Sequence, residues 1–303
     1  MFYLKYANIN SPHSSKNNTG LGNILFQLSF EYMIYKKYNL KISKLYFDII
    51  CSQIKNVNNN YDFMIYKKIE KIFQTKKVNE NIDLILKESK CHFYDENLLN
   101  IIKNNLSKNI IIESSYLQSY KYFYNYEKDI QEIFSPTEEV LKKIYLKYPM
   151  LNDKTYITIG VHLRMNWRQD ISYNNNLFIL NSINNIKKKL NSEKQYIIFI
   201  CSDDIIKAKK LFNNITENYY IFCENNLDYM DMWIMSLCEH NIICHSTLGW
   251  WSAYLNKNEN KYVFYPKESL IFYSKLTNTN INIIKNNYYP EKWICLESKS
   301  MKY

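Results

Sequence analysis

Polar side chains end three apolar runs in the second half of the sequence. The endings are His162 and Arg164 in "YITIGVHLR", Asp203 and Asp204 in "YIIFICSDD", and Ser246 and Thr247 in "IICHST". Each apolar run predicts a strand that is buried on both faces of a parallel sheet. Because ligands bind at the carboxyl ends of such strands, we expect these polar side chains to share one site.

The residue types suit an anionic ligand, and a diphosphate in particular. Arg164 has the forked donors that match phosphate oxygens. Ser246 and Thr247 add hydroxyl donors, and "LGWWSAYL" after them predicts a helix whose first N–H groups can bind an anion. A diphosphate that is held by an arginine and a helix N-terminus needs no metal ion.

Other residues suit a nucleoside. His162 and Asp231 could hydrogen-bond the edge of a base, and Asp203 could accept from ribose hydroxyls. A structural explanation stays open for each: a histidine satisfied inside the fold, and Asp203 and Asp204 as helix caps. We expect Arg164 to be buried at the end of its apolar strand, where it would need an anionic partner.

The sequence lacks the common metal and nucleophile motifs. No H-E-x-x-H, G-x-S-x-G or C-x-x-C is present, so we expect neither a metal site nor a nucleophilic serine or cysteine. The cysteines are odd in number and scattered, and several lie in apolar runs, where cysteine acts as a small hydrophobe. They are Cys51, Cys91, Cys201, Cys223, Cys238, Cys244 and Cys295.

The second half of the chain alternates predicted strands with predicted helices. Strands are expected over 156–164, 196–204, 219–223, 242–244 and 262–266. An amphipathic helix is expected over 177–190, and a further helix begins at Asp231 and ends at Asn241. The alternation predicts a parallel α/β sheet with both faces covered. We expect Trp250 and Trp251 to belong to the core.

The first half opens like a nucleotide-binding unit. A strand over 2–9 is followed by a polar loop with Gly20 and Gly22, and then by a helix from Leu25 onward. The loop lacks the third glycine of a dinucleotide fingerprint and the G-K-[ST] ending of a P-loop. A dehydrogenase or P-loop interpretation is therefore weak.

The rest of this half leads to a domain boundary. Strands are expected over 44–50 and 109–115, and two helices then run to about Tyr148, with Pro136 at a helix start. Pro149 breaks the chain after them. We therefore predict domains over 1–148 and 149–303.

Glycine is rare in this sequence. The chain has four glycines, Gly20, Gly22, Gly160 and Gly249, whereas an average chain of this length has about 21. We expect each to lie where the backbone needs a positive φ or approaches another group closely.

Composition indicates a folded protein of one large or two medium domains. The chain has 303 residues, of which 47% are hydrophobic and 22% charged. No apolar run approaches the roughly 18 residues of a membrane span, and the N-terminus lacks the pattern of a signal peptide. We expect a cytoplasmic protein without stable membrane insertion, and peripheral association and oligomeric state stay open. The formal net charge of +10 comes mostly from dispersed lysines, which is weak evidence for nucleic-acid binding.

Several segments, in order along the chain, resemble the α-1,2-fucosyltransferase family of glycosyltransferases (family 11). "GLGNILFQLSFEYMIYKK" is similar to the family's G-G-L-G-N-Q-x-F-Q motif, "SSYLQSYKYF" to Q-S-x-K-Y-F, and "IGVHLR" to the strand that ends in H-x-R-R-G-D-Y. "FICSDD" resembles F-S-D-D, and "YYPEKWI" resembles Y-P-x-x-W. The most specific match is "MDMWIMSLCEHNIICHSTLGWWSAYLN", which resembles a long segment with S-[ST]-F-S-W-W at its centre.

This resemblance implies a GT-B fold, in which two Rossmann-like domains face a central cleft. It implies an inverting, metal-independent transfer of L-fucose from GDP-fucose to a sugar hydroxyl of a glycan, in α-1,2 linkage. The N-terminal domain would lie on the acceptor side and the C-terminal domain on the donor side. By position, the implied catalytic residues are Arg164 and Asn23. The implied donor-binding residues are His162, Arg164, Asp203, Asp231, Ser246, Thr247 and Gly22.

The sequence departs from the family pattern next to the site. The family's R-R-G-D-Y corresponds to "RMNWRQD" here, with Met165 for the second arginine and Asn166 for the glycine. Arg168 or Asp170 could substitute after a shift of the loop. Two alternatives stay open: the same fold with another nucleotide-linked deoxyhexose as donor, and a non-catalytic protein that binds glycan or nucleic acid.

Overall fold

The structure is a computed structural model that describes residues 2–6, 20–40, 81–166, 176–213 and 219–297. The predicted strand over 44–50 lies outside the described residues, and so do Arg168 and Asp170. The chain forms two compact units, which are described separately. The first comprises residues 1–134 and 282–290, and the second comprises residues 135–281 and 291–303.

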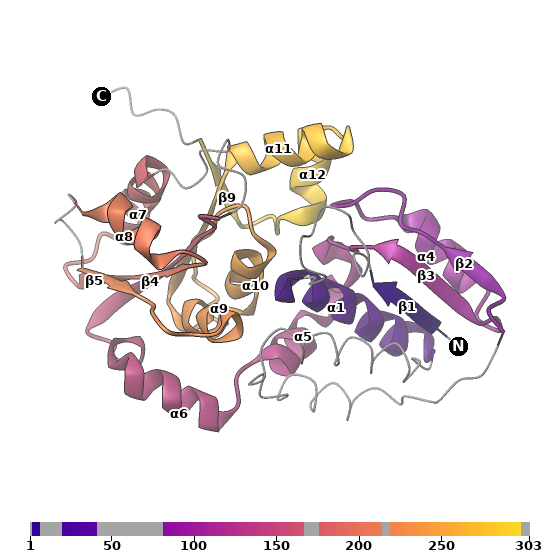
Figure 1. Ribbon diagram of the computed structural model, residues 1–303, viewed down its shortest axis with the longest axis horizontal. Coiled ribbons are helices and arrows are strands. Elements are labelled where there is room, and N and C mark those ends of the chain that lie inside the picture. Colours follow the sequence, from indigo (N-terminus) through magenta and orange to yellow (C-terminus); the bar gives the residue numbers. More distant parts are fainter. Residues whose placement is uncertain (1, 7–19, 41–80, 167–175, 214–218, 298–303) are drawn as a thin grey trace. The chain divides into compact units, whose positions relative to one another are not determined.

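The second unit contains a sheet of six parallel strands (Figure 1). The strands are β4 (Tyr156–Leu163), β5 (Gln195–Ser202), β6 (Tyr219–Phe222), β7 (His240–Ile242), β8 (Val263–Pro266) and β9 (Ile294–Leu296). Their order in the sheet is β6-β5-β4-β7-β8-β9. In chain order this is third, second, first, fourth, fifth, sixth, which is the Rossmann order. The direction of winding reverses between β4 and β7, where such sheets bind ligands.

Helices cover both faces of this sheet (Figure 1). They are α6 (Glu138–Lys147), α7 (Asn176–Leu190), α8 (Ile205–Phe212), α9 (Asp228–Leu237), α10 (Thr247–Leu255) and α11 (Lys267–Thr277), with a short 3-10 turn over Pro149–Leu151. Alternate residues of β4 point to opposite faces because strands have a period of two. Ile159 and Val161 pack in the cluster that contains Phe178 of α7. Gly160 and His162 face α9 and α10 instead.

The predicted elements around residue 240 need a correction. We expected the helix to end at Asn241 and the strand to cover 242–244, but α9 ends at Leu237 and β7 begins at His240. Asn241 lies in the strand, and its side-chain amide donates to the carbonyl of Met235 at 2.8 Å. The residue therefore satisfies a carbonyl in the last turn of α9 from the neighbouring strand.

The first unit contains a smaller parallel sheet. Its strands are β1 (Phe2–Tyr6), β2 (Leu84–Leu86) and β3 (Ile110–Ser115), in the order β1-β3-β2 among the described residues. Its helices are α1 (Leu21–Tyr38), α4 (Glu96–Lys103), α5 (Glu127–Phe134) and α12 (Ile281–Tyr288), with 3-10 turns over Tyr120–Tyr122 and Tyr124–Tyr126. No sequence pattern predicted β2 or α4. A helix start was expected at Pro136, and α6 begins two residues later, after its N-cap Thr137.

Helix α1 is present as predicted, but it begins at Leu21 rather than Leu25, so Gly22 lies in its first turn and not in the loop. The helix is buried along most of its length. Phe26 stacks on Tyr288, and Phe30 contacts Tyr122 edge to face. No glycine has a positive φ. Gly20, with φ −62° and nothing within 4 Å of a Cβ placed there, meets neither expectation. Close approach explains Gly160 instead, since a Cβ there would lie 2.9 Å from Cα of Met235.

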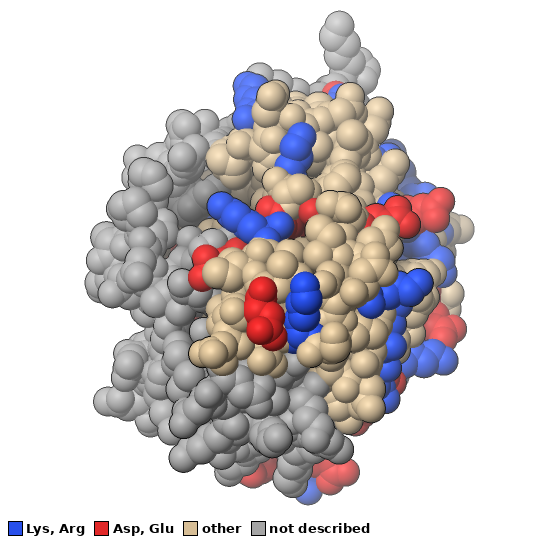
Figure 2. All heavy atoms as spheres, turned by 90° about the vertical axis from the view of Figure 1, so that its right-hand side faces the viewer, with Lys and Arg blue, Asp and Glu red and all other residues tan. Residues whose placement is uncertain are grey.

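Charge is interspersed rather than grouped on the face that Figure 2 shows. Lysine, arginine, aspartate and glutamate side chains alternate over its described part. Among the described residues, no helix has the length and apolar character needed to cross a bilayer.

Candidate functional site

The candidate site lies at the carboxyl edge of the six-stranded sheet, where β4 and β7 meet. Helix α10 begins there, directly after β7 and its short loop. Ser246 is the N-cap, and its Oγ accepts from the N–H of Leu248 at 3.2 Å. The first turn of α10 contains no acidic residue, and Ser246 and Thr247 are half-buried. The helix N-terminus thus retains the positive potential and the N–H donors that suit an anion.

His162 of β4 packs against α10. It is buried, and its Nδ1 lies 3.3 Å from Sγ of Cys244, two residues after the end of β7. Burial, together with the nearby charge of Arg164, lowers the pKa of His162 to about 3, so the ring is neutral at physiological pH. A Cβ on Gly249 would lie 3.0 Å from Cβ of His162, which explains why this position of α10 carries a glycine.

The tryptophans of α10 are part of the core. Trp250 and Trp251 are fully buried and contact each other edge to face. Trp250 also stacks on Tyr254. The prediction that the pair belongs to the core is confirmed.

Arg164 lies one residue beyond β4 and is not buried, contrary to our prediction. Its side chain is 45% exposed, because the strand ends at Leu163 and the chain leaves the sheet. The anionic partner that we expected is present: Nε of Arg164 lies 3.4 Å from Oδ2 of Asp203. The guanidinium is therefore accessible at the edge of the sheet and held by one carboxylate.

Asp203 holds the loop that follows Arg164. One carboxylate oxygen accepts from the N–H of Met165 at 2.6 Å, and the other accepts from the N–H of Asn166 at 3.3 Å. The amide of Asn166 donates to the main-chain carbonyl of Asp203 at 3.2 Å. Asn166, which replaces the family's glycine, is thus tied to Asp203 through both its main chain and its side chain. Contact between Asp203 and a ribose stays a prediction.

Asp204 has the role of a helix cap. Its Oδ1 accepts from the N–H of Lys207 at 3.0 Å, and it is the N-cap of α8. Hydrogen bonds to Lys207 lower the pKa of this carboxyl below its ordinary value. The structural alternative is thus correct for Asp204, whereas Asp203 anchors a loop.

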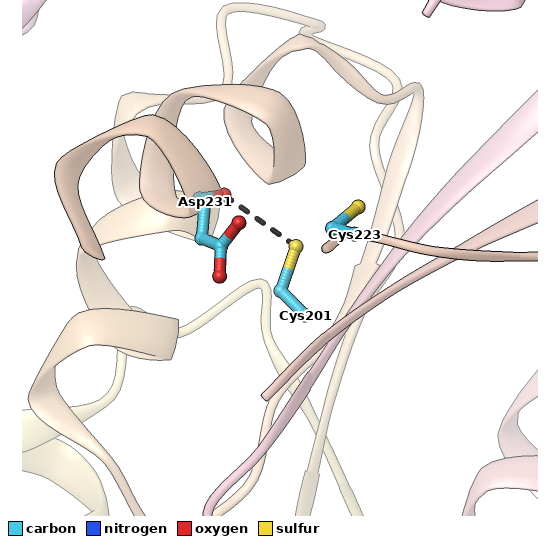
Figure 3. Close-up of side chains that lie close together, drawn as sticks. All are labelled: Cys201, Cys223 and Asp231. Atoms are coloured by element: carbon cyan, nitrogen blue, oxygen red, sulfur yellow. Dashed lines mark hydrogen bonds between the residues drawn. The ribbon is translucent and has the colours of Figure 1, made fainter. Parts of the chain in front are cut away.

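Asp231 belongs to a buried cluster with Cys201 and Cys223 (Figure 3). Their ligand atoms all lie within 4.8 Å of one another. The thiol of Cys201 donates to the main-chain carbonyl of Asp231 at 3.8 Å, and Asn226 donates to the Asp231 carboxyl at 2.9 Å. Burial raises the pKa of Asp231 to about 7. This carboxyl is thus enclosed by protein, and a contact with a base stays a prediction.

No sequence pattern predicted this cluster. Cys201 and Cys223 follow the paired residues Ile200 and Phe222 of neighbouring strands, and no spacing rule predicts that register. Thiolates and carboxylates are ligands for zinc, but a closed zinc site has four ligands and this cluster offers three. Burial also raises the pKa of Cys201 well above its ordinary value, which favours the thiol. We therefore assign the cluster to the polar core.

Asn23 and Gly22 lie in the first unit, in the first turn of α1. Gly20 is the N-cap and makes no side-chain bond. Oδ1 of Asn23 accepts from Nε2 of Gln118 at 2.7 Å. Both predicted residues are thus at a second helix N-terminus. The structure brings His162, Arg164 and Asp203 together with the start of α10, whereas Asn23 and Gly22 belong to a separate unit.

Comparison with known proteins gives the family. The model of glycosyl transferase family 11 matches residues 20–297. The chain is 40% identical over 76 residues to the O-antigen biosynthesis glycosyltransferase WbnK of Escherichia coli. This match covers 24% of this chain and 25% of that protein. It is 30% identical over 152 residues to an alpha-1,2-colitosyltransferase of Escherichia coli. This match covers 46% of this chain and 49% of that protein. The matched region therefore spans about half of the second relative and a quarter of the first.

Solved structures of glycosyltransferases are more distant in sequence. The NodZ alpha-1,6-fucosyltransferase soaked with GDP-fucose is 13% identical, with a TM-score of 0.46 over 84% of this chain and 92% of that one. The match to the family model extends from the glycine loop to the last described strand. The chain belongs to glycosyl transferase family 11.

Proposed function

We propose that the protein is an inverting glycosyltransferase that moves L-fucose from GDP-fucose to a sugar hydroxyl of a glycan, in α-1,2 linkage. One observation carries the proposal. A helix N-terminus without an acidic residue lies at the switch point of a Rossmann-ordered sheet, in the same unit as an exposed arginine that directly follows β4. In a family 11 chain, this is the place where a donor diphosphate is expected to bind.

The chemistry follows from where charge develops. As the glycosidic bond breaks, negative charge grows on the leaving diphosphate. Arg164 and the N–H groups at the start of α10 stabilise that charge, and fixed donors of this kind act most strongly in the transition state. The acceptor hydroxyl attacks from the opposite face, which inverts the anomeric centre. Because the diphosphate is held by protein donors, the proposal requires no metal ion.

The first unit completes the proposal. Asn23, beside Gly22 at the start of α1, contacts the sugar-phosphate, and the N-terminal half binds the acceptor. Each unit has a parallel sheet with helices, as the halves of a GT-B enzyme do. The partners are a nucleotide sugar and a glycan, which places the protein in carbohydrate metabolism or protein glycosylation. A cytoplasmic location stays a prediction.

The test is turnover. Release of GDP from GDP-fucose is measured with and without acceptors that end in galactose, N-acetylglucosamine or rhamnose. We expect one acceptor class to accelerate release and to gain an α-1,2-linked residue. If GDP binds but neither water nor any acceptor accelerates its release, the enzyme proposal is wrong, and a non-catalytic binder remains.

A second candidate keeps the fold and changes the donor sugar. Two observations favour it: one relative carries the name alpha-1,2-colitosyltransferase, and Met165 and Asn166 replace the family's arginine and glycine beside the site. Thermal unfolding with GDP, UDP or dTDP tests the nucleotide first. A ligand at about 100 times its Kd adds about 2.7 kcal/mol of stability. Stabilisation by UDP or dTDP without any by GDP would refute GDP-fucose as donor.

A non-catalytic protein that binds glycan or nucleic acid is a further alternative, and only the net charge of +10 supports the nucleic-acid version. It predicts binding that falls steeply with salt concentration and lacks nucleotide-sugar specificity. Persistence of GDP binding at moderate salt would exclude it.

A further inference from the structure

Gln118 lies in a partly buried chain of hydrogen bonds that ends at Asn23. Its Nε2 donates to Oδ1 of Asn23 at 2.7 Å, across 95 residues of sequence. Its Oε1 accepts from the thiol of Cys91 at 3.1 Å. Gln118 is 4% exposed, whereas Asn23 is half-buried. The chain thus runs from the protein interior to the start of α1.

The thiol fixes the direction of this chain. Burial raises the pKa of Cys91 well above its ordinary value, so the thiol keeps its proton and donates it. Because the thiol donates to Oε1 of Gln118, the Nε2 group of the same amide faces Asn23. Because Oδ1 of Asn23 accepts that bond, its Nδ2 group is left as a donor of two hydrogen bonds, with no partner among the described residues.

The backbone beside both interior residues is strained. His92, which follows Cys91, has φ 59°, and Leu117, which precedes Gln118, has φ 55°. Residues other than glycine rarely adopt this left-handed conformation, and such strain persists where the surrounding structure enforces it. The side-chain carboxyl group of Glu88 holds this conformation at Leu117 by accepting from the main-chain N–H at 3.0 Å.

A further contact anchors the same loop from its other side. The hydroxyl of Ser119 donates to the carbonyl of Asn287 at 2.6 Å. Gln118 therefore lies between two anchored neighbours, and its side chain has little freedom. A strained backbone that is held in place by surrounding contacts is typical of functional sites rather than of ordinary turns.

We propose that Gln118, oriented by Cys91, is a positioning residue that holds the Asn23 amide with its N–H groups available to an oxygen of the donor sugar-phosphate. This inference rests on the proposed function, because it takes Asn23 as a donor contact. It adds a role for a residue that does not itself touch the substrate.

The test is Gln118→Glu, which keeps the size of the side chain but replaces the donor with an acceptor. The Asn23 amide would then turn its N–H groups toward the new carboxylate. We expect kcat for GDP-fucose turnover to fall at least tenfold, on the scale of a misplaced transition-state donor. GDP affinity should change less than about threefold, because the diphosphate is held by the second unit.

Two controls separate positioning from a loss of folding. Ser119→Ala removes a buried hydrogen bond of the same loop without touching Asn23, so it should lower the melting temperature and leave kcat within about twofold. Cys91→Ser keeps a donor and should retain kcat, whereas Cys91→Ala should lower it. If Gln118→Glu does not fold, the difference in kcat between Cys91→Ser and Cys91→Ala tests the proposal instead.

The decisive comparison uses the Asn23→Ala background. If Gln118 acts through Asn23, Gln118→Glu should cost nothing further there, because coupled residues are not additive. The inference is overturned if Gln118→Glu has wild-type kcat, or if its loss is undiminished in Asn23→Ala. Absence of any turnover in the wild-type protein would instead refute the proposed function.

Discussion

Two strands of the same sheet lead into helices at the same edge, and the two helix starts differ in charge. After β5, the N-cap of α8 is Asp204, whose carboxylate accepts from the N–H of Lys207 and lies 3.1 Å from its Nζ. After β7, the N-cap of α10 is the neutral Ser246, and its first turn has no acidic residue. The first N-terminus is occupied by its own side-chain anion, whereas the second can accept an external one.

The difference shows how one sheet edge is divided into a structural side and a binding side. Near β5, carboxylates gather: Asp203 anchors a loop, Asp204 caps α8, and Asp231 lies beside Cys201. Near β7, the contacts at the start of α10 come from neutral groups such as His162 and Ser246. A helix dipole attracts an anion only where no fixed carboxylate already neutralises it.

The largest effect on turnover is expected for Arg164, the exposed cation in the same unit as the start of α10. Arg164→Ala should lower turnover at least 100-fold, on the order of the loss of one oxyanion donor. The matched control is Lys209→Ala on α8, a half-exposed cation whose Nζ lies 2.5 Å from a carboxylate oxygen of Glu224. That variant should stay within about twofold, since exposed ion pairs contribute little. Equal rates for Arg164→Ala and the wild-type protein would remove Arg164 from the mechanism.

A second prediction concerns the strand that positions Arg164. In Gly160→Ala, the new Cβ would lie 2.9 Å from Cα of Met235, so β4 and α9 must separate. We expect a loss of roughly 1–3 kcal/mol in the free energy of unfolding, as for other overpacked cores. Gly20→Ala is the control, because a Cβ there meets nothing within 4 Å. Similar denaturant midpoints for both variants would show that β4 tolerates a side chain at this contact.

The acidic side of the edge predicts a pH dependence of stability. Burial, with a contribution from Asp228, raises the pKa of Asp231 from 3.8 to about 7, although Asn226 and Lys147 oppose the shift. A raised folded-state pKa means that stability is full below about pH 4 and is lost as pH rises through 7. Asp231→Asn should therefore exceed the wild-type free energy of unfolding at pH 8 by about 1 kcal/mol or more. The gain should shrink toward pH 4.

Asp153 provides the control for that titration. It is exposed, and hydrogen bonds from Thr155 lower the pKa of its carboxyl below the ordinary value. Asp153→Asn should thus gain nothing at pH 8. A pH-independent difference between Asp231→Asn and the wild-type protein would contradict a neutral buried carboxyl.

Local patterns predicted much of the second unit, including the parallel strands, the helix after Ser246 and Thr247, and the tryptophan core. They failed where long-range contacts decide the outcome. Asn241 satisfies α9 from within β7, which moves both element boundaries, and Arg164 is exposed because β4 ends one residue before it. The bond between Gln118 and Asn23 joins residues far apart in sequence, so no spacing rule could reveal it.

The most direct test of the account exchanges the two caps and measures GDP binding by titration calorimetry. Serine and aspartate are both good N-caps, so Ser246→Asp and Asp204→Ser should each keep a melting temperature close to wild type. We predict that Ser246→Asp raises the Kd for GDP at least tenfold, because a fixed carboxylate would repel the diphosphate, and that Asp204→Ser leaves it unchanged. An unchanged Kd in Ser246→Asp would contradict the claim that the start of α10 binds the donor diphosphate.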